Sequence, residues 1–114
     1  MKTWQDENEV KNDLETVAQY LRKNFKKATS YDDVYEKYEK WGEKAHNEMM
    51  KGKNKEKTQY NWGCLETIIA LCEFLNASST EGMADKIEEE GFAKNFADYQ
   101  KNKIFDRNLQ ERPE

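Results

Sequence analysis

Apolar residues recur every three or four positions along most of this chain, which is the spacing of one face of an α-helix. No segment alternates strictly between apolar and polar residues for long enough to predict a strand. Proline occurs once and glycine five times, so few residues interrupt helices. We therefore expect an all-α protein, a small bundle of four to five helices that forms one domain over residues 1–114.

The first two helices are predicted from their apolar stripes and caps. The first spans about residues 6–27, with acidic residues at its start and basic residues at its end, as the helix dipole favours. The second begins after Ser30, a typical N-cap residue, and ends near Met50. The first stripe contains Val10, Leu14, Val17, Ala18, Leu21 and Phe25, and the second contains Tyr31, Val34, Tyr35, Tyr38, Trp41, Ala45 and Met49.

The third helix, about residues 58–76, is the most apolar segment of the chain. Its apolar residues cover more than half of the circumference, and only Glu66 and Glu73 mark a polar edge. A helix of this kind is buried by several neighbours, so we expect it to be the centre of the bundle. Cys64 and Cys72 are eight residues apart, about 12 Å along a helix, which is too far for a disulfide.

The C-terminal third predicts two further helices. The first, about residues 80–90, has its cap among Ser78, Ser79 and Thr80 and Gly91 as its stop. The second, about residues 92–102, carries Phe92, Phe96 and Tyr99. The apolar residues that follow, Ile104, Phe105 and Leu109, do not continue this phase. We therefore expect them to form a turn folded back on the body, followed by a loose tail beyond about residue 110.

Composition favours a folded, soluble, cytoplasmic protein. Apolar residues make up 36% and charged residues 37%, but three Trp, six Tyr and five Phe supply a core that a disordered chain would lack. The net charge is only -4. No signal peptide or membrane-spanning segment is evident, and two unpaired cysteines are typical of a reducing compartment.

Glu39, Glu43 and His46 share one edge of the second helix and are candidates for a metal site, which could also draw on Glu66 or Glu73. Glu43 and His46 have the Glu-x-x-His spacing of di-iron bundles. A full site would need a second such pair, but the chain has a single histidine. We therefore expect no metal and no cofactor, and leave a metal- or small-molecule-binding bundle as an alternative.

Catalytic and nucleic-acid-binding patterns are weak. Cys64 lies within the apolar arc of its helix, where a thiol is usually inert, so a pair with His46 is not expected to be nucleophilic. The run Lys51–Lys57 is basic, but residues 31–57 as a whole carry no net charge, so direct nucleic-acid binding is a second alternative only.

Acidic residues crowd the end of the predicted fourth helix, where the helix dipole favours cations. The stability of the helix does not require this cluster. We therefore interpret it, together with two tyrosines of the second helix, as a surface for a basic partner. The residues are Glu81, Asp85, Glu88, Glu89, Glu90, Tyr31 and Tyr35.

The leading hypothesis is therefore a non-catalytic protein that binds another protein and regulates or inhibits it. The acidic surface suits the basic groove of a nucleic-acid-handling enzyme. In size and composition the chain is similar to small acidic helical proteins that phages and mobile elements carry. A homodimer is left open, since the tyrosine face suits an interface as well as a core.

Overall fold

The computed structural model describes residues 6–111, and the side chains of residues 6–103. This part of the chain contains no strand and five helices: α1 (Glu7–Asn24), α2 (Tyr31–Met50), α3 (Glu56–Leu75), α4 (Met83–Ile87) and α5 (Phe92–Glu111). The prediction of a small all-α bundle is confirmed.

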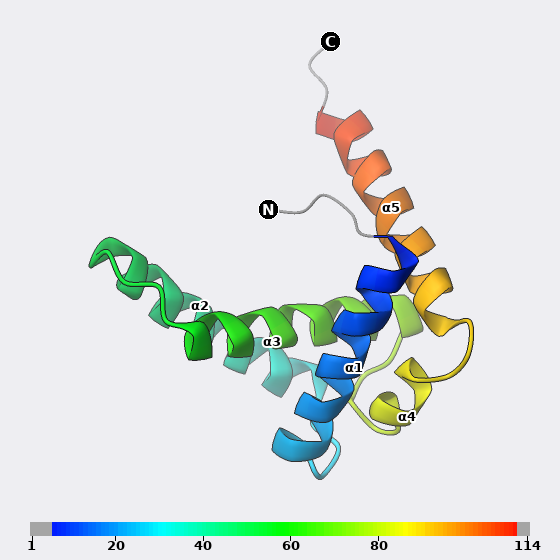
Figure 1. Cartoon of the computed structure of the whole chain (residues 1–114), viewed down its shortest axis with the longest axis horizontal. Coiled ribbons are helices and arrows are strands. Elements are labelled where there is room, and N and C mark those ends of the chain that lie inside the picture. The colour runs from blue at the N-terminus through cyan, green and yellow to red at the C-terminus, as the bar shows by residue number, and fades with distance from the viewer. Residues whose placement is uncertain (1–5, 112–114) are drawn as a thin grey trace.

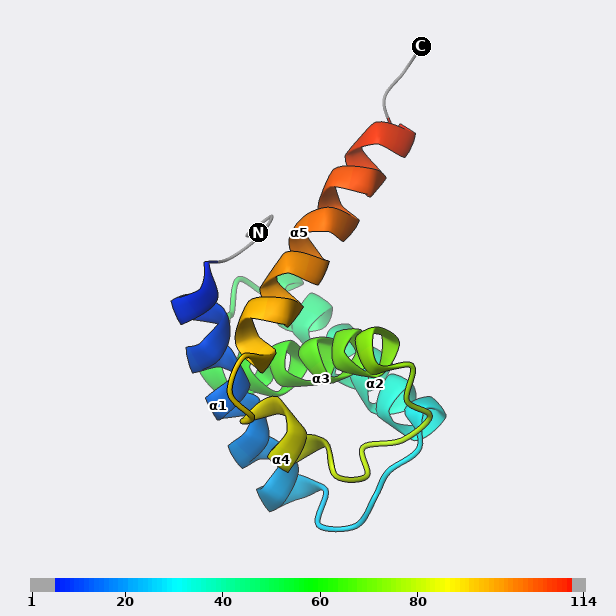
Figure 2. The same cartoon turned by 90° about the vertical axis from the view of Figure 1, so that its right-hand side faces the viewer.

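The five helices form a body and a projecting hairpin. Figure 1 shows α2 and α3 running side by side, in opposite directions, as a hairpin that points away from the other helices. α1 crosses α3 and packs against α4 and α5. In the view of Figure 2, α5 continues beyond the other helices.

The core lies where α1 meets the second half of α3. The predicted stripe of α1 is buried from Val10 to Leu21, and Leu65, Ile68 and Leu71 of α3 are fully buried beside it. α3 packs against α1, α2 and α5, so its prediction as the central helix is confirmed. Sequence reasoning missed Tyr20, which is also buried in α1.

The first half of α3 is more exposed than its sequence suggests. Tyr60 was assigned to the apolar arc, but 46% of its surface is exposed, and Gly63 is exposed as well. The prediction that only Glu66 and Glu73 face solvent is therefore wrong. Its cause is that α2 is the main neighbour of this half of α3, which α1 reaches mainly through Tyr20, beside Tyr60 and Asn61.

The two loops at the base of the hairpin are joined by hydrogen bonds. Ser30 caps α2 as predicted, since its Oγ accepts from the backbone N–H of Asp33 at 3.2 Å. On the other side, Thr29 N–H donates to Thr80 Oγ1 at 2.9 Å, and Thr80 N–H donates to Thr29 O at 2.9 Å. Ser30 and Ser79 form a single antiparallel β-bridge between these hydrogen-bonded segments.

The fourth helix is much shorter than residues 80–90. It spans only Met83–Ile87, and Gly82 precedes it in the left-handed conformation with φ +67°. Because the Thr80 hydroxyl binds the loop before α2, it does not cap α4. Gly91, with φ +84°, lies directly before α5 rather than directly after α4.

The last helix is longer than predicted. α5 continues to Glu111, although the sequence pattern changes phase after Tyr99. The first turns pack on the body, where Phe74 of α3 lies 5.4 Å from Phe96 and 4.9 Å from Tyr99 between ring centroids. A helix that extends past its packing partners needs no continuous stripe. The side chains of Ile104, Phe105 and Leu109, and residues 112–114, lie outside the described residues.

Candidate functional site

An acidic groove lies between α1 and the turn that joins α4 to α5. Its volume is about 550 Å³ and its lining residues are Glu7, Lys11, Glu15, Ile87, Glu88, Glu89, Glu90, Gly91 and Ala93. Five glutamates thus surround one lysine, and the floor includes the buried side chain of Ile87.

Two acidic residues of α1 belong to this groove and were missed from the sequence. Glu7, Lys11 and Glu15 are spaced four residues apart, so they lie on one face of α1. That spacing could have been noticed, but only the packing of α1 against α4 and α5 brings these residues beside Glu88, Glu89 and Glu90. The predicted acidic cluster is therefore larger than the sequence indicates.

Arg22 of α1 pairs with two members of the predicted cluster. Its guanidinium donates to Asp85 Oδ1 at 2.8 Å and also to Glu88 Oε1. The hydrogen bond from Arg22 holds the pKa of the Glu88 carboxyl below its ordinary value. Asp85 and Glu88 therefore have an ion-pair partner within the chain, although exposed pairs of this kind contribute little to stability.

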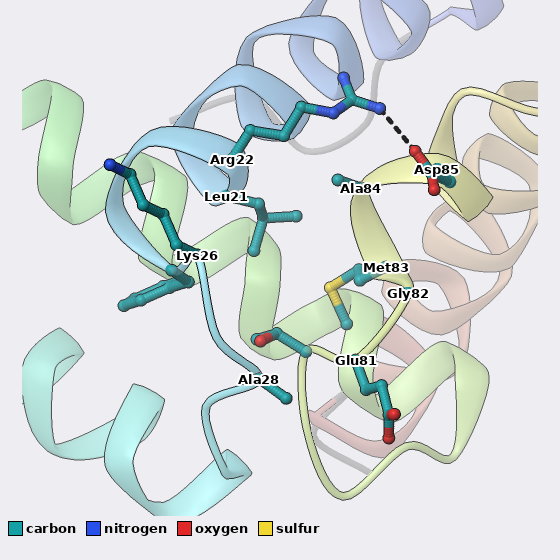
Figure 3. A pocket seen from close by; sticks show the side chains of 11 residues that line it. Leu21, Arg22, Lys26, Ala28, Glu81, Gly82, Met83, Ala84 and Asp85 are labelled. Atoms are coloured by element: carbon teal, nitrogen blue, oxygen red, sulfur yellow. Dashed lines mark hydrogen bonds and ion pairs between the residues drawn. The ribbon is translucent and has the colours of Figure 1, made fainter.

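Glu81 and Asp85 lie at a different pocket, between the C-terminal end of α1 and α4 (Figure 3). This pocket has a volume of about 500 Å³. Leu21 and Met83 form its buried apolar wall, while Arg22 and Lys26 balance the two acids. Its rim carries both signs of charge, so it does not select a basic partner as the acidic groove does.

Tyr31 and Tyr35 lie on α2, and no residue of α2 lines the acidic groove. Their rings are 6.1 Å apart, and Tyr35 contacts Tyr38, which stacks on Trp62 of α3 at 6.3 Å. Tyr35 is exposed and Tyr31 half-buried. The seven predicted partner-binding residues therefore fall into three groups, two of which adjoin through Arg22.

Glu39, Glu43 and His46 are all exposed on α2. Among the described residues, no group of three or more His, Cys, Asp or Glu side chains is arranged to hold a metal ion. Glu43 instead lines an open depression whose other charged residues are mostly lysines. The alternative of a metal-binding bundle thus gains no support from this edge of α2.

This depression defines a basic hairpin tip, where α2 ends and α3 begins. Its volume is about 380 Å³ and its lining residues are Lys40, Glu43, Lys44, Asn47, Glu48, Lys51, Lys53 and Lys55. Five lysines outnumber two glutamates there. The sequence run Lys51–Lys57 indicated part of this tip, but the folding of the hairpin adds Lys40 and Lys44.

A glycine turn shapes the basic hairpin tip. Lys53 N–H donates to Glu48 O at 2.8 Å and Gly52 N–H to Met49 O at 3.0 Å, which is the Schellman arrangement. It requires the left-handed conformation of Gly52, with φ +72°. The chain therefore reverses tightly, and the loop lysines lie at the end of the α2–α3 hairpin.

A buried hydrogen bond links α2 and α3 close to this turn. Glu48 Oε2 accepts a hydrogen bond of 2.8 Å from Thr58 Oγ1, and both residues are buried. Glu48 Oε1 is buried without a hydrogen-bond partner. The sequence analysis missed this pair, because a glutamate in an amphipathic helix is ordinarily exposed.

The two cysteines are free and buried, as the sequence analysis expected of structural thiols. Burial raises the pKa of Cys64 to about 11, despite a smaller opposing effect of its hydrogen bond with Tyr60. A thiol with a raised pKa stays protonated near neutral pH, and the protonated form is a poor nucleophile.

Among the described residues, none of the helices combines the length and apolar character that crossing a membrane requires. Comparison of the chain with protein-family models, with curated proteins and with solved structures gave no match.

Proposed function

We propose that this protein is a non-catalytic binding module that receives a basic segment of another protein in its acidic groove and thereby regulates or inhibits that protein. The observation that carries the proposal is the lining of the groove, where five glutamates outnumber a single lysine. Complementary charge of this kind speeds association and selects the partner.

The groove also has a small apolar area, so the bound segment can be partly apolar as well as basic. Ala93 is half-buried among the lining residues, whereas Ile87 is only 3% exposed. Binding gains most from apolar contacts at the centre of an interface and from charges that select the partner around it. A nucleic-acid-handling enzyme is one class of protein with basic surfaces of this chemistry.

Within the groove, Glu89 and Glu90 are the strongest candidates for direct contact. Both are exposed, whereas Glu88 already accepts a hydrogen bond from Arg22. Glu81, Asp85, Tyr31 and Tyr35 would contact only a partner that extends over neighbouring surfaces. The proposal takes the cytoplasm as the compartment, because the two buried cysteines are free.

Affinity purification from the native host, followed by mass spectrometry, would identify the partner. Its binding to purified wild-type protein would then be compared with binding to a Glu89→Gln/Glu90→Gln variant. We expect at least about tenfold weaker binding for this variant, with a slower association rate, because two attractive charges are removed.

The matched control is Glu36→Gln/Glu39→Gln, which removes two exposed glutamates from α2. It should leave the affinity unchanged within about twofold, a difference well below 1 kcal/mol. The proposal fails if both variants bind the partner equally well, or if no stoichiometric protein partner is recovered.

A further inference from the structure

We infer that the basic hairpin tip of one chain docks into the acidic groove of a second copy, so that the protein associates head to tail. The inference rests on the proposed function, since it takes the same groove as a docking surface. It names a second copy of this chain as an occupant of the groove, in addition to the basic partner.

The charges of the two surfaces are complementary. The tip depression is lined by five lysines and two glutamates, and the groove by five glutamates and one lysine. Opposite charges on two surfaces steer them together, and at low ionic strength this attraction extends over a longer distance.

The tip also exposes apolar side chains that a protein surface can cover. Met49 and Met50, at the end of α2, are 63% and 76% exposed and are among the few large apolar side chains of residues 6–103 left to solvent. In the groove, Ala93 is half-buried, whereas Ile87 is only 3% exposed. Methionine adapts its shape to irregular apolar surfaces, so the tip can bury these two side chains on docking. A bare phosphate backbone would leave the methionines exposed, which favours a protein occupant.

The shape of the molecule prevents a chain from docking with itself. In Figure 1 the hairpin projects to one side, while the α4–α5 turn lies on the opposite side of the body. The hairpin ends in the tight turn at Gly52, whereas the groove lies against α1 on the body. Because two different surfaces meet, each added copy leaves one tip and one groove free for further association.

Sedimentation of the purified chain over a concentration series tests this inference. At about 20 mM salt the average mass should rise with protein concentration, and at about 500 mM it should return to that of the monomer, because salt screens exposed charges. Circular dichroism would confirm that every variant keeps its helical content.

Charge reversal gives the decisive comparison. Lys51→Glu/Lys53→Glu should make the tip acidic, and Glu15→Lys/Glu89→Lys/Glu90→Lys should make the groove basic, because two glutamates then face four lysines. Each variant alone should be monomeric at low salt, because its tip and groove then carry like charges. An equimolar mixture should associate again, with alternating copies. A matched reversal at the exposed end of α1, Lys23→Glu/Lys27→Glu, should associate like the wild type.

A wild-type chain that stays monomeric at low salt would overturn the inference, as would association that the tip and groove variants leave intact. A monomer whose tip lysines bind a fluorescein-labelled oligonucleotide in a salt-sensitive manner would also overturn it, and would make the tip a nucleic-acid surface. The proposed function would survive these results if Glu89→Gln/Glu90→Gln still weakened binding of the basic protein partner.

Discussion

The body of the molecule and the outer part of its hairpin are filled by different kinds of side chain. In the body, α1, α4, α5 and the second half of α3 bury a continuous cluster of aliphatic and aromatic residues. In the outer arm, residues 38–63, Ala45 is the one apolar residue that is buried, and the other two buried residues are Glu48 and Thr58.

This difference follows from the number of helices that cover each region. A helix in the body has neighbours on several sides, whereas α2 and the first half of α3 have mainly each other. Large rings such as Tyr38, Trp41 and Trp62 therefore remain half-buried in the arm. Within residues 6–103, the two buried side-chain polar atoms without a hydrogen-bond partner, Glu48 Oε1 and Trp62 Nε1, also lie there. The body holds the fold together, and the arm carries the basic hairpin tip at a lower local stability.

The largest effect should come from the body. Ile68→Ala would leave a cavity among fully buried neighbours and should lower the free energy of unfolding by about 2–5 kcal/mol. Urea denaturation measures this loss. Met49→Ala in the exposed arm should change it by less than about 0.5 kcal/mol. Equal losses for the two variants would remove the distinction between body and arm.

Alkaline pH should also weaken the body. Burial raises the pKa of Cys64 to about 11 and that of Tyr20 to about 12, above the ordinary values of 9.0 and 10.0. Above pH 9 the unfolded chain loses these protons first, so stability is complete below that pH and falls as the pH rises through the two folded-state values. The loss should be on the order of 2 kcal/mol for each group.

Urea denaturation between pH 8 and pH 12, the range that spans these pKa values, would measure this slope. In Cys64→Ala the slope should largely disappear between pH 9 and pH 10 and become shallower up to pH 11, where Tyr20 still contributes. An unchanged slope would mean that other groups cause the alkaline loss.

Thr58→Val tests the hydrogen bond between Thr58 and Glu48 that links the two helices of the arm. It removes the hydroxyl that donates to Glu48 and leaves a buried carboxylate without this partner, which should cost about 1–3 kcal/mol. Hydrogen exchange should show the loss mainly in residues 38–63. The double variant Glu48→Leu/Thr58→Val should regain most of it, because replacing both partners by apolar groups leaves no unpaired charge. A double variant as unstable as the single one would argue against this pair.

The smallest effect compares two helical glycines of the arm. Gly63→Ala should stabilise the protein by up to about 1 kcal/mol, since helices favour alanine and a new Cβ meets nothing within 4 Å. A Cβ at Gly42 would lie 3.1 Å from Trp62 Nε1, so Gly42→Ala should gain clearly less or destabilise. Thermal melts of both variants measure the difference. Equal gains would show that Trp62 moves freely and that α2 and α3 pack loosely there.

Much of the fold could be predicted from local signals. The stripe from Val10 to Leu21 and the cap at Ser30 lie within single helices, so the sequence shows them directly. The fourth helix was predicted too long because Thr80 binds the distant Thr29 instead of capping α4. Such a hydrogen bond joins residues far apart in the chain, and no local pattern indicates it.

The candidate site was predicted only in part. Glu88, Glu89 and Glu90 are consecutive and stand out in the sequence, but the glutamates of α1 that complete the acidic groove do not. Likewise the loop lysines were evident, whereas Lys44 and Lys40, which pairs with Glu36 at 3.3 Å, belong to α2 and join the depression only through folding.

The sequence by itself determined which segments are helical and which face of each helix is apolar, because helix spacing, capping and turn residues act over a few positions. Tertiary structure alone decided which charges stand together. The α2–α3 hairpin collects lysines at one end of the molecule, and the packing of α1 against α4 and α5 collects glutamates at the other. Charges interact through space, so their grouping into opposite surfaces depends on how the helices pack.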